Sequence, residues 1–458
     1  MTTIDRGWSM LPRELVEEII LKIDWPEDVL RFSRVCRAWF DAFMRIRPKW
    51  TPANPWILLS ENTHDNPECL RKAYNPGNNK FYQFKLPETF GRNCWGSDLG
   101  WIITLGLDLE MSLFNPLTKL RLYLPCTNTL MRTTFTNAEP EVVLLDYGVC
   151  KEDCEHYPYW MREVYILRAC ILKTGKQLKL YNDVNEDLDD DDDNDGLFVA
   201  VIHVRERVDY FDHNLIKSTY LSVARPGDIR WTLIETPSDL CIRDVIFWRD
   251  LLWFTDNEGS LWYVDLNKGG GPSFKSMECL VNPQEPEDVK NPMHYLVQSS
   301  NQELLLVKRF SKATIHYTMS DYFETNYTNN GLEFDYDDNY CAHHDLNSIY
   351  RKSMSSFTQR FRIYKLDLSS NMWKPVVDTS DFGGITMFLG KNTSQIATAS
   401  RSGTCKANCI YFTGEHIIKC GHDIGIYNLD SDKIEAFYNG HDTDSDYCIP
   451  FWFTPLLY

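Results

Sequence analysis

The sequence has no long apolar segment. None of its apolar runs approaches the roughly 20 residues needed to cross a bilayer, and its first ten residues lack the apolar core of a secretory signal. We therefore expect no membrane partner and an intracellular location, in the nucleus, the cytoplasm or both. The 14 cysteines are irregularly spaced, which predicts reduced thiols and no disulfide framework.

The sequence is also short of positive charge. It has 47 Lys and Arg against 65 Asp and Glu, a formal net charge of −18. Residues 1–50 hold nine basic and eight acidic residues, a net of +1, so the remaining 408 residues carry −19. A body this acidic repels phosphate backbones, and we expect no direct binding of nucleic acid.

The sequence signatures of familiar catalytic centres are missing as well. There is no Gly-x-Ser-x-Gly elbow, zincin helix or kinase motif set, and residues 384–391 have one residue too many between their glycines for a phosphate loop. The Cys and His residues at 150–156 and 341–344 lack the second ligand pair that structural zinc requires. The sequence therefore predicts no catalytic residues, no metal ligands and no cofactor.

The N-terminal segment has the apolar spacing of helices. In residues 11–23 an apolar side chain recurs every four positions, at Leu11, Leu15, Ile19 and Ile23. A second helix is predicted to follow, opened by a capping box of Asp24 and Glu27, with apolar residues at Phe32, Val35, Cys36, Trp39 and Phe43. About forty residues are near the lower limit for burying a core of their own. This segment must therefore present apolar surface to a partner or to the rest of the chain.

These residues resemble the F-box, the adaptor-binding module of SCF-type ubiquitin ligases. The family pattern is Leu-Pro, a Glu-Leu-Leu step and an Ile-Leu pair, followed later by Val-Cys-Lys-x-Trp, and it covers residues 8–48 here. The resemblance implies a docking surface for a Skp-family adaptor. Eight residues would form or support that surface: Leu11, Pro12, Leu15, Ile19, Ile20, Val35, Cys36 and Trp39.

From Trp56 onward, short strand patterns replace the helical period. They are bounded by Gly, Pro, Asn and Asp clusters, which is typical of all-β folds. An aromatic or apolar strand that ends in an Asn or Asp turn recurs along the chain, at 113–119, 262–267, 363–370 and 426–431. This repetition favours a β-propeller, and blades of about 40–50 residues predict roughly seven of them. A pair of β-sandwiches is the structural alternative.

The body also resembles the propeller of the KIB-type F-box proteins, a plant family. The segments that carry the resemblance are 247–253, 361–367 with Trp373, 387–390, 407–413 and 450–455. The predicted fold is therefore a small all-α F-box at residues 1–50, followed by a large all-β domain at residues 51–458. This second domain is expected to be a β-propeller of about seven blades, with polar insertions near 183–196 and 311–358.

The two resemblances together imply the substrate-recognition subunit of an SCF-type E3 ubiquitin ligase. The adaptor would connect the chain to cullin and RING subunits, and the propeller would recruit a protein substrate that the sequence does not identify. The chain would hold that substrate near the E2 and would not itself be an enzyme. Two alternatives remain open: a propeller enzyme, or carbohydrate- or small-ligand-binding protein, with merely structural N-terminal helices, and an adaptor-bound protein that delivers no substrate.

Overall fold

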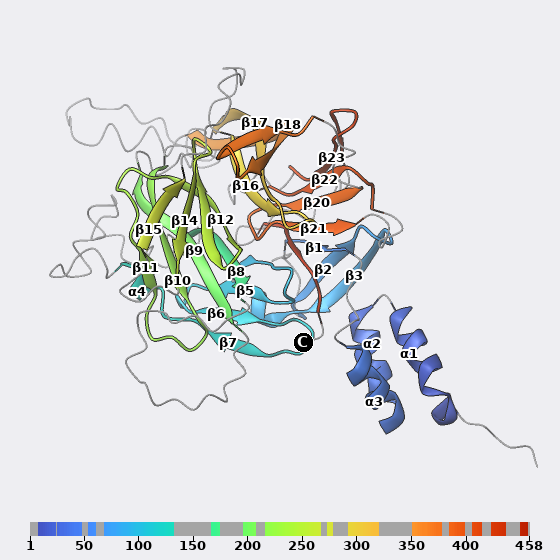
Figure 1. Cartoon of the computed structure of the whole chain (residues 1–458). Coiled ribbons are helices and arrows are strands. Elements are labelled where there is room, and N and C mark those ends of the chain that lie inside the picture. The colour runs from blue at the N-terminus through green and yellow to red at the C-terminus, as the bar shows by residue number, and fades with distance from the viewer. Residues whose placement is uncertain are drawn as a thin grey trace, which may run out of the picture.

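In the computed structural model, three helices lie beside a ring of β-sheets (Figure 1). The structure describes residues 8–23, 25–47, 54–60, 68–131, 166–174, 196–207, 216–266, 273–277, 292–319, 350–377, 384–398, 405–414, 423–436 and 449–456. In these ranges, none of the helices has the length and apolar character required to span a lipid bilayer.

The N-terminal segment forms three helices, and the prediction of a single second helix is wrong. After the short turn η1 (Trp8–Met10) come α1 (Arg13–Leu21), α2 (Pro26–Ser33) and α3 (Arg37–Ile46). Cys36 is extended, with φ −161° and ψ 169°, and forms the N-cap of α3. The break lets α3 contact both α1 and α2. Apolar spacing did not reveal the break, because the spacing is the same on both sides of it.

The predicted capping box places the N-cap at Asp24, which lies outside the described residues. The structure has Trp25 as the N-cap of α2, and the Trp25 side chain makes no capping hydrogen bond. The helix begins at Pro26, whose fixed φ suits the first helical position. Trp25 therefore lies at the helix entrance, where its side chain is free to pack elsewhere.

Six sheets form the blades of a propeller, each described here from its innermost strand outward. Blade 1 contains β25 (Phe451–Phe453), β1 (Trp56–Leu58), β2 (Leu70–Asn75) and β3 (Lys80–Lys85). Blade 2 contains β4 (Asn93–Trp95), β5 (Ile102–Leu105), β6 (Met111–Phe114) and β7 (Arg121–Tyr123), and blade 3 contains β8 (Ile166–Lys173), β9 (Leu197–Arg207), β10 (Ile216–Ala224) and β11 (Thr232–Ile234). Two short helices flank blade 2: η2 (Pro87–Thr89) and α4 (Asn128–Met131).

The second half of the ring has the same plan, with one added strand. Blade 4 contains β12 (Ile242–Trp248), β13 (Leu251–Asp256), β14 (Leu261–Asp265) and β15 (Ser273–Met277), and blade 5 contains β16 (Met293–Gln298), β17 (Leu304–Met319), β18 (Tyr350–Asp367) and β19 (Met372–Pro375). Blade 6 has five strands: β21 (Gln395–Thr398), β20 (Ile385–Leu389), β22 (Cys409–Phe412), β23 (Gly425–Asn428) and β24 (Lys433–Ala436).

The predicted all-β propeller is confirmed, with six blades in place of about seven. The 408 residues from 51 to 458 give 68 per blade, more than the 40–50 on which the prediction rested. Long connections take up the difference, such as residues 175–195 between β8 and β9. The predicted insertion at 183–196 lies in this connection, and its residues 183–195 are outside the described part of the chain.

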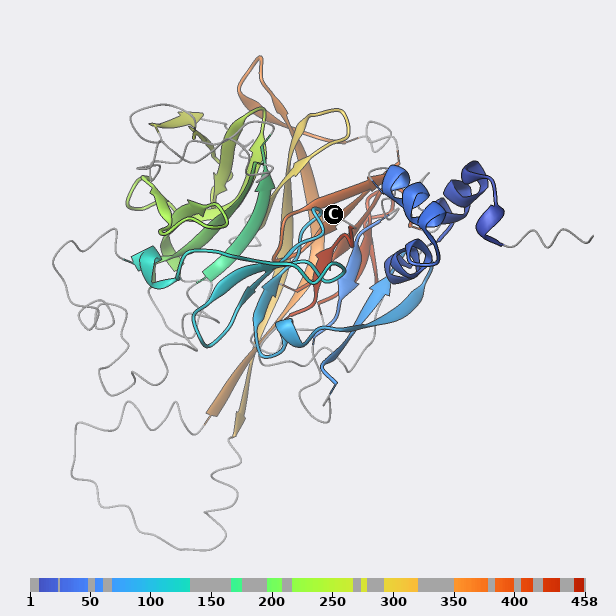
Figure 2. The ribbon, with the colours of Figure 1, turned by 90° about the horizontal axis from the view of Figure 1, so that it is seen from below.

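The ends of the second predicted insertion, 311–358, are strands. Residues 311–319 continue β17, and residues 350–358 begin β18, with antiparallel pairing from Ser311 and Thr358 to Met319 and Tyr350. This hairpin projects beyond the rest of the ring (Figure 2). The sequence missed it because mostly polar residues leave no alternation of apolar and polar positions. Residues 320–349 lie outside the described part.

The four repeated strand-and-turn units occupy equivalent places in their blades. Each belongs to the strand next to the outermost one, in blades 2, 4, 5 and 6, although Asn267 of the second unit lies outside the described residues. In three of them the side chain of the Asn or Asp accepts the backbone N–H two residues later: Asn115 from Leu117, Asp367 from Ser369, and Asn428 from Asp430. The repeat is therefore an Asx turn that directs the chain back into the outermost strand.

The C-terminal strand closes the ring. β25 pairs with β1 in blade 1, where Trp56 faces Phe453 and Ile57 faces Trp452. Blade 6 also binds β25, because the Trp452 indole donates a hydrogen bond to the Leu389 carbonyl of β20 at 3.0 Å. The first and last strands of the propeller are thus fixed to each other and to blade 6.

Polar side chains fill the centre of the ring. The turn between β20 and β21 carries Lys391 and Asn392, both buried, and Lys391 Nζ lies 3.3 Å from Asn93 Oδ1 in blade 2. Next to this turn, Arg168 of blade 3 pairs with Asp244 of blade 4 at 2.9 Å. A buried charge is tolerated only when it is paired and hydrogen-bonded, so these contacts fix how the blades meet.

Two histidines are buried inside the blades without charge. His203 Nε2 is 2.9 Å from Ser222 Oγ, and His294 Nδ1 donates to the Asp256 carbonyl at 2.7 Å. Burial lowers the pKa of each from 6.5 to about 3, because water no longer stabilises the imidazolium.

These histidines predict acid sensitivity. Below pH 6.5 the unfolded chain binds protons that the folded chain does not bind until about pH 3. Between these values the free energy of unfolding should fall by up to about 1.4 kcal/mol per pH unit for each histidine. In urea unfolding at several pH values, the free energy of unfolding should therefore fall less steeply with decreasing pH for His203→Gln and for His294→Gln than for the wild type. Equal slopes in all three proteins would contradict this assignment.

Candidate functional site

The N-terminal helices are rich in exposed apolar side chains. Of the 18 large apolar side chains exposed in the described residues, seven lie in the helical segment: Trp8, Met10, Leu15, Leu21, Val35, Phe40 and Met44. This segment, described from residue 8 to residue 47 except Asp24, makes up 39 of the 290 described residues. Exposed apolar side chains gathered in one segment are typical of interaction sites.

The eight predicted docking residues have three different environments. Pro12, Leu15 and Val35 are exposed, Leu11, Ile19 and Cys36 are half-buried, and Ile20 and Trp39 are buried. The Trp39 ring stacks on Phe32 with centroids 4.0 Å apart, and its indole donates to the Trp8 carbonyl at 3.4 Å. The buried pair can only support a docking surface, whereas the exposed three can contact a partner directly.

The structure adds exposed residues that the sequence analysis missed. Phe40 and Met44 lie one turn apart on α3, beside the buried stripe of Trp39, Phe43 and Ile46. The signal was present in the sequence, since α3 has apolar residues on more than one stripe. The packing of α3 on the rest of the protein accounts for its buried stripe but not for the exposed apolar residues Phe40 and Met44.

Trp25 joins the helices to the propeller. Its ring stacks on Tyr82 of β3 with centroids 4.4 Å apart and planes inclined by 6°, and on Trp56 of β1 at 5.5 Å and 18°. Phe84 closes the group, 4.8 Å from Trp25. Aromatic pairs at these distances are stabilised beyond the area that they bury.

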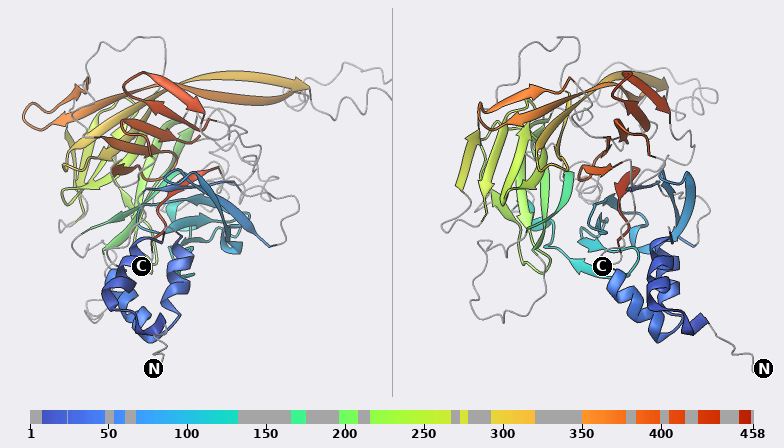
Figure 3. Two further views of the ribbon diagram at one scale, coloured as in Figure 1. Left: turned by 90° about the vertical axis from the view of Figure 1, so that its right-hand side faces the viewer. Right: turned by 45° about the vertical axis from the view of Figure 1, so that its right-hand side comes forward.

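Around this stack, the helices and the propeller share one hydrophobic core. Val16, Val29 and Phe43 from the helices lie in the same cluster as Phe84 of blade 1 and Phe114 of blade 2. Burial lowers the pKa of Lys119 in blade 2, and the carboxylates of Glu88 and of Glu27 in α2 oppose this shift, so α2 also interacts with blade 2 through charge. The helical segment is therefore bound to blades 1 and 2 as well as connected to them by the chain. Figure 3 shows the helices side by side with these blades in two further views.

Metal ligands were not expected, and the described residues contain no group of three or more His, Cys, Asp or Glu placed to hold an ion. The two Cys and His groups weighed as zinc ligands, at 150–156 and 341–344, lie outside the described residues. The eight described cysteines are free thiols.

The Trp25 stack predicts that substitution of Trp25 destabilises the protein much more than substitution of Trp8. Trp25→Ala should lower the free energy of unfolding by about 3 kcal/mol, because it removes a large ring packed on three aromatic neighbours. Trp8→Ala is the matched control, since the Trp8 side chain is 74% exposed, and it should change stability by less than about 0.5 kcal/mol. Chemical unfolding followed by circular dichroism measures both. Similar losses in the two variants would show that the stack does not hold the helices.

Comparison with known proteins places the whole arrangement in a family. A putative F-box protein of Arabidopsis thaliana is 21% identical over 454 residues, covering 98% of both chains. An F-box/kelch-repeat protein of the same plant is 31% identical over 116 residues, which cover 24% of this chain and 30% of that protein. Among solved structures, an oligogalacturonate lyase in complex with manganese is 8% identical with a TM-score of 0.34, covering 82% of this chain and 74% of that one; a likeness of that size indicates no function.

The family model "KIB1-4 beta-propeller" matches residues 73–428, more than three quarters of the sequence. These residues run from blade 1 to blade 6. The relatives named as F-box proteins extend the likeness beyond the propeller, because the full-length match includes the N-terminal helices. The chain therefore belongs to the KIB1-4 beta-propeller family, and its relatives are plant F-box proteins.

Proposed function

We propose that this chain is the substrate-recognition subunit of an SCF-type E3 ubiquitin ligase. Its N-terminal helices, residues 8–47, dock a Skp-family adaptor, which brings the cullin and RING subunits, and its propeller recruits a protein for ubiquitination. The chain catalyses no step and acts by holding the substrate near the E2. It works in the nucleus, the cytoplasm or both. The F-box relatives and the KIB1-4 beta-propeller match support this proposal.

The observation that carries the proposal is the exposed apolar surface on helices that already share a core with the propeller. Leu15, Val35 and Phe40 are each more than 45% exposed, although the side chains next to them in the sequence, Val16 and Trp39, are buried. Burying an exposed aliphatic or aromatic side chain contributes about 1.5–3 kcal/mol. Burial of several such residues can offset the free-energy cost of association, whereas burial of a single one cannot.

Substitution of exposed residues tests adaptor docking without disturbing the core. Leu15→Asp combined with Val35→Asp should abolish co-purification with a Skp-family adaptor, because both positions lie on the surface that the proposal buries. The matched control is Ile229→Asp combined with Val377→Asp, two exposed apolar residues of the propeller. This control should bind the adaptor like the wild type.

Thermal unfolding of both double variants shows whether they remain folded. Loss of adaptor binding in the helix variant alone, with unchanged unfolding temperatures, is the expected result. A folded wild-type chain that does not bind the adaptor would overturn the proposal.

The Trp25 stack has a role of its own in this function. If the helices and the propeller form one rigid unit, a reconstituted ligase should modify a restricted set of the chain's own lysines, those that lie near the E2. Trp25→Ala should leave adaptor binding intact, because Trp25 faces the propeller, and should spread self-ubiquitination over more lysines. Mass spectrometry of the modified lysines measures this spread. An unchanged set of sites would show that the stack does not orient the propeller.

A further inference from the structure

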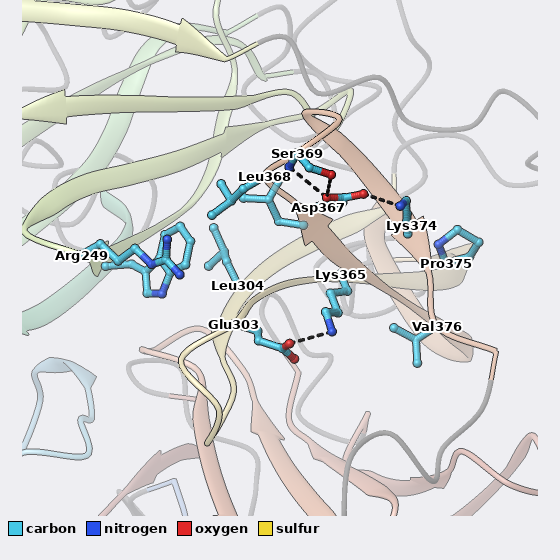
Figure 4. A pocket seen from close by; sticks show the side chains of 12 residues that line it. Arg249, Glu303, Leu304, Lys365, Asp367, Leu368, Ser369, Lys374, Pro375 and Val376 are labelled. Carbon is cyan, nitrogen blue, oxygen red and sulfur yellow. Dashed lines mark hydrogen bonds and ion pairs between the residues drawn. The ribbon is translucent and has the colours of Figure 1, made fainter.

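A pocket of about 490 Å³ lies where blades 4 and 5 meet (Figure 4). The turn between β12 and β13 contributes Arg249, and the beginning of β17 contributes Leu304 with the preceding Glu303. The end of β18 and the turn that follows it contribute Lys365, Leu366, Asp367, Leu368 and Ser369, and β19 with the residue after it contributes Lys374, Pro375 and Val376. A volume of this size suits a few side chains of a bound segment.

Hydrogen bonds and a shared core hold blades 4 and 5 together beside the pocket. The Trp248 indole of blade 4 donates to the Gln302 carbonyl of blade 5 at 3.0 Å, and the Trp373 indole of blade 5 donates to the Gly259 carbonyl of blade 4 at 2.9 Å. Leu304 and Leu366 are buried in the core that the two blades share. The pocket is therefore formed before any ligand arrives, which reduces the entropy cost of binding.

Both carboxylates of the lining already have cationic partners. Glu303 pairs with Lys365 at 2.6 Å. Asp367 pairs with Lys374 and also accepts hydrogen bonds from Ser369. Lys374 and these hydrogen bonds lower the pKa of Asp367 well below its usual range, so it remains an anion. The four charges satisfy one another on one side of the pocket, as Figure 4 shows.

Arg249 stands apart on the other side (Figure 4). Among the described residues it has no carboxylate within ion-pair distance, and its guanidinium lies 4.5 Å from the centroid of the Trp248 ring. The lining thus holds three cations and two carboxylates, on a chain whose net charge is −18. A guanidinium with free N–H groups beside an apolar floor suits the carboxylate or phosphoryl group of a ligand.

Arg249 and Asp250 form the two-residue turn between β12 and β13, and their backbone conformation is one that glycine or asparagine usually adopts. Arg249 and Asp250 both have positive φ, 51° and 61°. Two-residue hairpin turns with positive φ at both positions strongly prefer Asn-Gly or Asp-Gly. The conformation directs a large cationic side chain to the edge of the pocket, where a glycine would leave none.

The pocket and the helices lie toward the same end of the strands. Arg249 follows the end of β12, the innermost strand of blade 4, and the corresponding innermost strand of blade 1, β25, ends at Phe453. Phe453 pairs with Trp56, where the chain enters the ring from the helices. The innermost strands of a propeller run in the same direction, so a ligand at Arg249 faces the end of the ring at which the helices are attached.

We infer that this pocket binds an anionic side chain flanked by an apolar one, in an extended segment of a protein partner. The inference rests on the proposed function and names the substrate class. Arg249 pairs with the anion, and the neighbouring apolar side chain rests on Leu304 and Leu368, which lie between Arg249 and the two ion pairs. Val377, 90% exposed next to the lining residue Val376, extends the apolar contact beyond the pocket.

A phage-displayed library of random 12-residue peptides, selected on the full-length chain, tests this inference. Selection should enrich peptides with Asp or Glu next to Leu, Ile, Met or Phe. Synthetic versions of enriched peptides should bind at least tenfold more weakly to Arg249→Glu and to Arg249→Gln than to the wild type. Arg230→Gln, at an exposed arginine of blade 3, is the matched control and should not change the affinity. Circular dichroism establishes that each variant is folded.

Replacing the acidic residue of a bound peptide by phosphoserine or by Gln identifies the anion. Tighter binding of the phosphoserine peptide assigns a phosphoryl ligand, tighter binding of the original assigns a carboxylate, and equal binding of the Gln peptide overturns the inference. Enrichment without acidic residues, or binding that Arg249→Glu does not weaken, overturns it too. The assay contains no adaptor, so a chain that binds these peptides but not the adaptor would refute the ligase role and leave the pocket assignment standing.

Discussion

Closure of the ring by β25 and β1 is the constraint on which the other parts of this structure depend. The pairing joins the two ends of the propeller, and it places Trp56 at the point where the chain leaves the helices. Trp56, Tyr82 and Phe84 then form the surface on which Trp25 stacks. Without closure, Trp56 would have no fixed position, and the helices would lose the blade against which they bury their apolar side chains.

The apolar residues of the helices therefore have two separate tasks. Val16, Ile20 and Phe43 join the core that is shared with the propeller, whereas Leu15, Val35 and Phe40 remain on the surface. A segment of about forty residues cannot bury all its apolar side chains in itself. The propeller covers one part of them, and the exposed part is the surface on which we propose that an adaptor docks. This division would allow one short segment both to pack on the propeller and to bind a partner.

Charged groups are used differently at the centre of the ring and at its edge. At the centre, Arg168 and Asp244 are buried and paired, and their role is to fix the blades relative to one another. At the junction of blades 4 and 5, the ion pairs of Glu303 and Asp367 are partly exposed, and Arg249 has no carboxylate partner among the described residues. Ion pairs that face water contribute little to stability. The charges at the edge are thus better explained by recognition than by folding.

The sequence by itself determined the order of the domains and the class of each one. Spaced apolar residues from Leu11 to Trp39 predicted the helices, and repeated strands that end in Asn or Asp turns predicted a propeller, because both signals depend on neighbours in the chain. Only the tertiary structure decided the number of blades and the break in the helices at Cys36. It also decided that Leu15 is exposed whereas Ile20 is buried. The same holds for the Trp25 stack and the Arg249 pocket, whose parts come from segments far apart in the sequence. No local pattern encodes which distant surfaces meet, because burial depends on the packing of the whole ring around each residue.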